Sequence, residues 1–283
     1  MKNAPAVKHR YDYFKYSLPP ESAELYAERA LTILRGLRDR FPAFYELFRS
    51  PSEVLTLSGV RAFDTYYELG EDAQQADVDA LADYLKTAGI LLVDETFAVA
   101  GENNPEKRYS LIHMQALHEI PARYGYVPEW LDLNFADVKQ PSDFFFWWLS
   151  WKERIGSAAM SGRIKKMPDR WGNSWRATHN ITFGILLGYP GEAICSDVQC
   201  EEDYLSGIEM VGDVGRSKAE LDEAVANGAT ITTNARIQHA DKYAGAQPVY
   251  YYEASLKTNQ HIVAHEKLWS DILTLVYAGL DEE

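Results

Sequence analysis

The sequence predicts a predominantly helical α+β fold with a small antiparallel sheet. Apolar residues recur at helical spacing through most of the chain, while two segments near its C-terminal end have the composition of strands. The 283 residues, of which 46% are hydrophobic, are enough to bury a large core. We expect an N-terminal helical region, residues 1–100, and an α+β region, residues 107–283, separated by the loop 101–106. The same pattern is compatible with one continuous domain.

Three helices are expected in the N-terminal region. Residues 21–49 have acidic side chains in the first turn and repeat leucine at roughly helical intervals. Residues 60–69 and 77–87 are expected to form two shorter helices, and the glycine that follows each of them would end it.

Two further helices are predicted in the middle of the chain. Residues 143–155 carry large apolar side chains at helical spacing, which favours a core-facing stripe over a cofactor-binding motif. The stripe consists of Phe144, Trp147, Trp148, Trp151 and Ile155. A second helix is expected over residues 174–187, with Ser174 as its N-cap and with Gly188 and Pro190 at its end.

The remaining segments supply the predicted sheet and a terminal helix. Residues 109–117 fit either a strand or a short helix, and residues 193–198 a short turn. Residues 230–239 alternate between apolar and polar side chains, as a half-buried strand does. They can pair with the β-prone residues 249–254 in a hairpin with a long loop. Residues 259–278 are expected to form the last helix.

Charge and cysteine content exclude several classes of protein. The 28 basic and 42 acidic side chains give a net charge of −14, which is unfavourable for broad nucleic-acid binding. No apolar run is long enough to cross a bilayer, and the first residues lack the apolar core of a secretory signal. We therefore expect a cytoplasmic protein without membrane contact. Cys195 and Cys200 do not have the spacing of a zinc site or a redox motif, so reduced thiols are expected. No cofactor motif is present, and we expect no cofactor.

The charge is distributed unevenly along the chain. Residues 147–176 contain five of the seven tryptophans and carry seven basic and two acidic side chains, a net charge of +5. The other residues together carry −19. Residues 192–223 alone, with ten acidic and two basic side chains, carry −8. A local anion site is therefore compatible with the acidic total.

This basic, tryptophan-rich segment is the predicted ligand-binding site. Residues 156–162 are mostly small, so their backbone N–H groups can approach a phosphate or carboxylate closely, and arginine can bind it through two N–H groups. We expect Trp171 or Trp175 to stack on a planar ligand. The sequence thus predicts binding of an anionic small molecule near residues 156–179. The predicted binding residues are Arg163, Lys165, Lys166, Arg170, Trp171 and Trp175.

Whether a reaction follows binding is left open by the sequence. His179 is the candidate for catalytic proton transfer, because its unperturbed pKa lies near neutrality and it lies four residues after Trp175. Hydrolysis or group transfer by acid–base catalysis is the class of reaction that these residues favour.

Two alternatives rest on other features. The basic segment could instead dock on an acidic protein partner, or pair with the acidic residues 192–223 of the same chain. A metal-dependent hydrolase is the other alternative, because His261 and His265 are four residues apart on one helix face and could bind the same divalent ion. Glu266 falls in line with the apolar stripe of that helix, so it would need a partner if buried.

Overall fold

A computed structural model describes residues 16–67, 69, 73–94, 109–124, 135–160, 175–243 and 250–282. Its helices are α1 (Ala23–Arg40), α2 (Pro42–Phe48), α3 (Pro51–Ser58), α4 (Gln75–Thr87), α5 (Met114–Arg123), α6 (Pro141–Met160), α7 (Trp175–Leu186), α8 (Gly191–Leu205), α9 (Lys218–Ala226), the short 3-10 helix η3 (Ala254–Leu256) and α10 (Gln260–Asp281). Its strands are β1 (Phe63–Tyr67), β2 (Ile90–Asp94), β3 (Tyr109–His113), β4 (Met210–Gly212), β5 (Thr230–Asn234) and β6 (Tyr251–Glu253).

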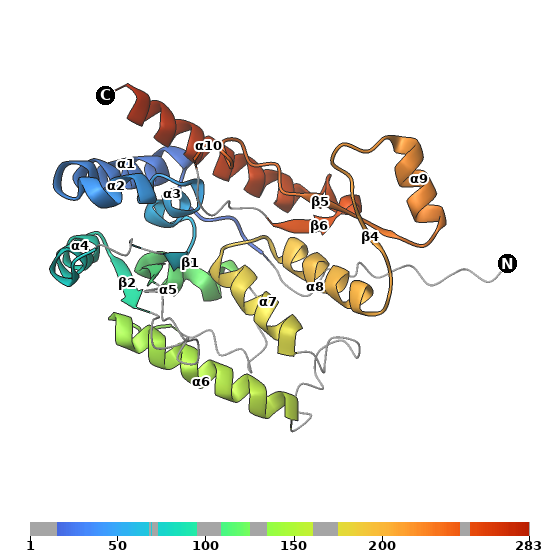
Figure 1. Ribbon diagram of the computed structural model, residues 1–283, viewed down its shortest axis with the longest axis horizontal. Coiled ribbons are helices and arrows are strands. Elements are labelled where there is room, and N and C mark those ends of the chain that lie inside the picture. The colour runs from blue at the N-terminus through green and yellow to red at the C-terminus, as the bar shows by residue number, and fades with distance from the viewer. Residues whose placement is uncertain are drawn as a thin grey trace.

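The structure confirms a predominantly helical α+β fold, with two small sheets (Figure 1). The first sheet is antiparallel in the order β1-β3-β2, and Ile112 pairs with both Phe63 and Leu91. The second sheet, in the order β4-β5-β6, is mixed. Its β4 and β5 are parallel and joined through α9, whereas β5 and β6 form the predicted antiparallel hairpin.

Both faces of the first sheet are buried, and each contributes to a different part of the core. Leu92 and Leu111 pack with α1, α3 and α10, while Leu91 and Ile112 pack with α5, α6 and α7. This division follows from the two-residue period of a strand, which sends successive side chains to opposite faces. Figure 1 shows α1 and α10, the first and last helices, side by side on one side of the molecule and α6 on the other.

The N-terminal helices differ from the prediction at two places. The helix expected over residues 21–49 is interrupted at Phe41, where Pro42 begins α2. The prediction of a helix over residues 60–69 is wrong. Gly59 adopts a left-handed conformation with φ of 85°, which ends α3, and the aromatic-rich residues that follow form β1. The helix expected over residues 77–87 is confirmed as α4.

Further along the chain, several predicted elements are confirmed with changed bounds. Residues 109–117 begin as β3 and continue as α5. The turn expected over residues 193–198 is part of the 15-residue helix α8. The strand expected over residues 230–239 ends at Asn234. The side chain of Asn259 caps α10 by accepting hydrogen bonds from the N–H groups of His261 and Ile262. The expected boundary at residues 101–106 lies outside the described residues.

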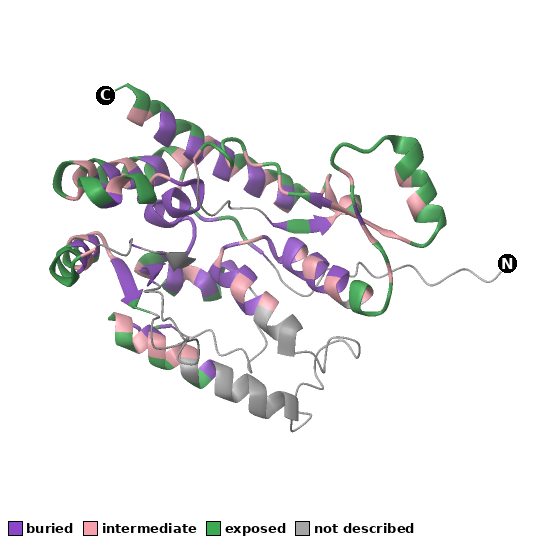
Figure 2. Ribbon diagram, viewed as in Figure 1, coloured by how far each residue is buried: buried purple, intermediate pink, exposed green. Residues whose placement is uncertain are grey.

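Burial agrees with the core-facing reading of the tryptophan stripe on α6. Phe144 and Trp151 are buried, and Trp147 and Trp148 pack partly buried against the same cluster. The helix α9, by contrast, has no buried residue and projects from the body of the molecule (Figure 2). Among the helices that the structure describes, none combines the length and apolar composition needed to cross a membrane.

Candidate functional site

The residues predicted to bind an anion fall largely outside the described part of the chain. This is the case for Arg163, Lys165, Lys166, Arg170 and Trp171. Trp175 and His179 lie in the first turns of α7, where the structure describes the backbone and not the side chains. Their convergence on a ligand therefore remains a prediction.

Further along α7 there is a pocket of about 220 Å³ between α7 and α8. Asn180, Phe183, Gly184 and Leu187 line it from α7 and the residue after it. Ala193, Ile194 and Asp197 line it from α8. The remaining wall consists of Tyr189, Tyr250 and Tyr251. The volume is below the roughly 300–1,000 Å³ of pockets for drug-sized ligands, so it suits a molecule of about one ring.

A tight turn joins the two helices that line this pocket. The helix expected to run to Leu187 ends one residue earlier, at Leu186, and Gly188, whose φ is 77°, and Pro190 follow before α8 begins. The N–H groups of Gly188 and Tyr189 donate to the carbonyls of Ile185 and Gly184, respectively. These two carbonyl groups in the last turn of α7 therefore have hydrogen-bond partners. Gly184 also allows close packing of the helices, because a Cβ atom there would lie 2.7 Å from Cγ1 of Ile194.

One wall of the pocket is aromatic and rigidly supported. The rings of Tyr189 and Tyr250 are 4.8 Å apart, and Tyr250 also packs edge-on against Trp269 of α10. The hydroxyl of Tyr250 lies 3.0 Å from Nδ1 of His265, and Nε2 of His265 lies 2.9 Å from the carbonyl oxygen of Gly188. Burial raises the pKa of Tyr250 and lowers that of His265 to about 3, so both groups stay neutral at physiological pH.

Asp197 is the charged residue among those that line the pocket. Burial, together with the nearby charge of Glu201, raises the pKa of Asp197 to about 6. None of the Lys, Arg or His side chains that the structure describes forms an ion pair with it. Next to it, Asn180 donates a hydrogen bond of 2.5 Å to Glu201, which fixes the amide at the edge of the pocket.

The two histidines of the metal alternative have separate roles. Nδ1 of His261 lies 2.5 Å from Glu192 and joins α10 to α8, whereas both ring nitrogens of His265 are used by Tyr250 and Gly188. Within the described residues, no group of three His, Cys, Asp or Glu side chains is placed to hold a metal. This geometry does not favour the metal alternative. Glu266 is buried and has the partners that its position requires, the hydroxyl of Tyr252 and the backbone N–H of Arg236.

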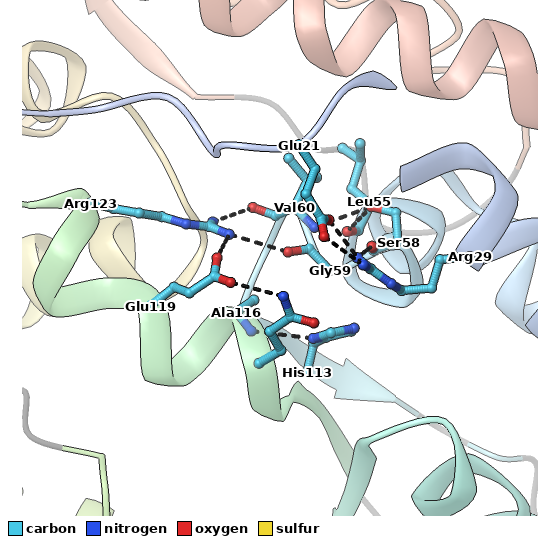
Figure 3. A network of polar contacts seen from close by, with 11 residues as sticks. Glu21, Arg29, Leu55, Ser58, Gly59, Val60, His113, Ala116, Glu119 and Arg123 are labelled. Carbon is cyan, nitrogen blue, oxygen red and sulfur yellow. Dashed lines mark hydrogen bonds and ion pairs between the residues drawn. The ribbon is translucent and has the colours of Figure 1, made fainter. Parts of the chain in front are cut away.

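A second polar cluster surrounds the turn after α3. Figure 3 shows Arg29 of α1 and Arg123 of α5 approaching this turn from two sides. Arg29 donates to the carbonyl of Ser58 and pairs with Glu21, and Arg123 donates to the carbonyls of Gly59 and Val60 and pairs with Glu119. These carbonyls would otherwise be orphaned at the end of a helix. We therefore assign this cluster to stability rather than to ligand binding.

Sequence reasoning missed Asp197, Tyr250 and Tyr251 as candidate functional residues. The signal for Asp197 is weak but present, since it lies three and four residues from Ile194 and Ala193 on one face of a helix. No local signal connects this helix face with Tyr250, more than fifty residues later. Both cysteines are free and buried, as expected for reduced thiols.

Comparison with known proteins gives no match of any kind. No protein-family model, no curated protein and no solved structure is significantly similar to the chain.

Proposed function

We propose that this protein binds a small molecule in the pocket between α7 and α8. The pocket itself supports the proposal, because it combines apolar and aromatic walls with a few polar groups, as small-molecule sites do. A half-buried carboxyl group with a raised pKa, as at Asp197, is also more common at functional sites than elsewhere. The neutral, hydrogen-bonded Tyr250 and His265 favour binding over acid–base chemistry at this wall.

A pocket-filling variant tests the proposal. Leu187 lines the pocket and is partly exposed, so Leu187→Trp places a larger side chain at its edge. Leu47→Trp is the matched control, since Leu47 is also at the surface but belongs to α2. Native mass spectrometry of gently purified protein would identify a retained ligand, and ligand-detected NMR with a library of small ring compounds would find binders.

We expect each binder to lose at least tenfold in affinity for Leu187→Trp and to keep its affinity for Leu47→Trp. Thermal unfolding of both variants shows that they are folded. Equal affinity of all three proteins for every binder found, or no binder and no retained ligand, would contradict the proposal.

The anionic site at residues 156–179 is a second proposal, supported by the net charge of +5 in the tryptophan-rich segment. Exchange of Arg163, Lys165, Lys166 and Arg170 for glutamine tests it. Inorganic phosphate should bind the unmodified protein, and binding should weaken at least tenfold in the fourfold variant. Unchanged phosphate binding would exclude this segment as the anion site. Its charge would then be explained by an acidic protein partner or by the acidic residues 192–223 of the same chain. A cytoplasmic location is also proposed, and the free cysteines support it.

A further inference from the structure

The pocket between α7 and α8 is lined on one side by an acidic helix. Asp197 is the charged residue in its lining, and the whole of α8 carries five acidic and no basic side chains. A carboxylate that is half removed from water and is not paired with any Lys, Arg or His side chain in the described part of the chain is costly, and a bound cation would offset this cost. The field of the acidic helix attracts cations to the same place.

The aromatic walls select among cations. Four of the residues that line the pocket are aromatic, namely Phe183, Tyr189, Tyr250 and Tyr251, and the rings of Tyr189 and Tyr250 are neighbours. Aromatic faces attract organic ammonium groups by cation–π interaction and cover the apolar part of the same molecule. A metal ion fits less well, because the described residues offer no group of three metal-binding side chains here.

We infer that the ligand of this pocket is a small organic amine, bound as the ammonium ion, with its charge paired to Asp197 and its apolar part against the tyrosine rings. This inference rests on the proposed function, because it names the class of ligand for the same pocket. The raised pKa of Asp197 is consistent with it, since an ammonium ion would restore the ionised form that burial disfavours.

Three ring compounds of similar size and different charge test the inference: benzylamine, benzyl alcohol and benzoate. Their affinities are measured by calorimetry at pH 8, where both Asp197 and benzylamine are ionised. The proteins are the full chain, Asp197→Asn, and Asp203→Asn as a control. Asp203 lies on the same helix outside the pocket and accepts a hydrogen bond from Gln199, which asparagine can retain.

Benzylamine should bind the unmodified chain at least tenfold more tightly than benzyl alcohol. This preference should disappear in Asp197→Asn and persist in Asp203→Asn. Equal affinity for the amine and the alcohol, or a preference that survives Asp197→Asn, would overturn the inference and leave the pocket itself as a binding site. Tighter binding of benzoate would also overturn it. Binding of none of the three compounds overturns the amine inference alone, because the proposed function is decided separately by the Leu187→Trp comparison.

Discussion

The hydroxyl of Tyr250 donates a hydrogen bond to Nδ1 of His265. The direction follows from the other ring nitrogen, Nε2, which faces the carbonyl oxygen of Gly188 and must therefore carry the proton. The imidazole is fully buried in this neutral form. The wall of the pocket is thus held by a chain of two hydrogen bonds that links residue 250, α10 and the turn after α7.

Removal of the Tyr250 hydroxyl should destabilise the protein. In Tyr250→Phe, Nδ1 of His265 loses its donor and remains buried, which costs about 1–3 kcal/mol in free energy of unfolding. Tyr251→Phe is the control, because Tyr251 is 54% exposed and should change stability by less than about 0.5 kcal/mol. Urea unfolding measures both. Equal stability of the two variants would show that the bond contributes nothing.

Buried neutral histidines should make the fold sensitive to acid. Burial lowers the pKa of His265 to about 3, and burial together with Arg29 and Arg123 lowers that of His113 to about 4. Each group has an ordinary pKa of about 6.5 when unfolded, so the unfolded state binds protons first as the pH falls. Stability should therefore decrease from pH 6.5 towards pH 4, by up to about 1.4 kcal/mol per pH unit for each histidine.

His113→Asn separates one of these contributions. Nδ1 of His113 caps α5 by accepting from the N–H of Ala116, and the asparagine oxygen can replace it without titrating. The variant should lose part of the dependence of stability on pH between 6.5 and 4. His239→Asn, at an exposed position, should retain all of it. An identical pH dependence in the His113 variant would show that this imidazole is protonated in the folded state.

A buried carboxyl group should make the protein less stable as the pH rises, the opposite of the effect of the histidines. Burial and the charge of Asp64 raise the pKa of Glu53 to about 9, although Arg61 opposes this, so Glu53 is protonated at neutral pH. Because the folded state keeps this proton above the unfolded pKa of about 4.5, this contribution to stability is lost as the pH rises towards 9.

Glu53→Gln should remove this loss. The amide cannot ionise and can still donate to Asp64, so the variant should be more stable than the unmodified protein by about 1–3 kcal/mol at pH 9. Glu28→Gln, on the exposed surface of α1, should change little at the same pH. Chemical unfolding between pH 7 and 9 is the measurement. A variant that loses stability with pH as steeply as the unmodified protein would disprove the assignment.

The sequence predicted helices with an apolar stripe well and predicted fully buried or fully exposed elements poorly. α6, α7 and α10 each have a periodic apolar face, and all three were expected near their observed bounds. β2 was missed because both of its faces are buried, so its residues form a continuous apolar run without alternation. α9 was missed because it buries no residue, although Ser217 and Glu220 form a capping box that could have been recognised.

The candidate site depends on long-range packing, which explains why periodicity did not predict it. A helical stripe places Ile262 and Trp269 towards the core, but it does not say that Tyr250 covers His265 between them. The pairing of the two histidines in one metal site was plausible from their spacing alone. Their partners, Glu192 for one and Tyr250 with Gly188 for the other, come from distant parts of the chain.

Two glycines with similar backbone conformations provide a test of the polar cluster around α3. Gly59 and Gly89 have φ of 85° and 75°, so alanine at either position incurs a left-handed backbone cost of about 1–2 kcal/mol. A Cβ atom at Gly89 would have no neighbour within 4 Å, whereas at Gly59 it would lie 2.7 Å from Nε2 of His113 and 2.8 Å from Nη1 of Arg29. Arg29 cannot move away without giving up its bond to Ser58.

Gly59→Ala should therefore reduce the free energy of unfolding by at least about 2 kcal/mol more than Gly89→Ala does, because it disturbs the arginine and histidine contacts as well as the backbone. Urea unfolding of the two variants at the same pH gives this difference directly, and the shared backbone cost cancels. If the two substitutions had the same effect, the contacts of Arg29 and His113 at this turn would contribute no stability. Where the expected difference is observed, Arg29→Met combined with Gly59→Ala localises it, since relief of the clash should make the double variant less destabilised than the sum of the single variants.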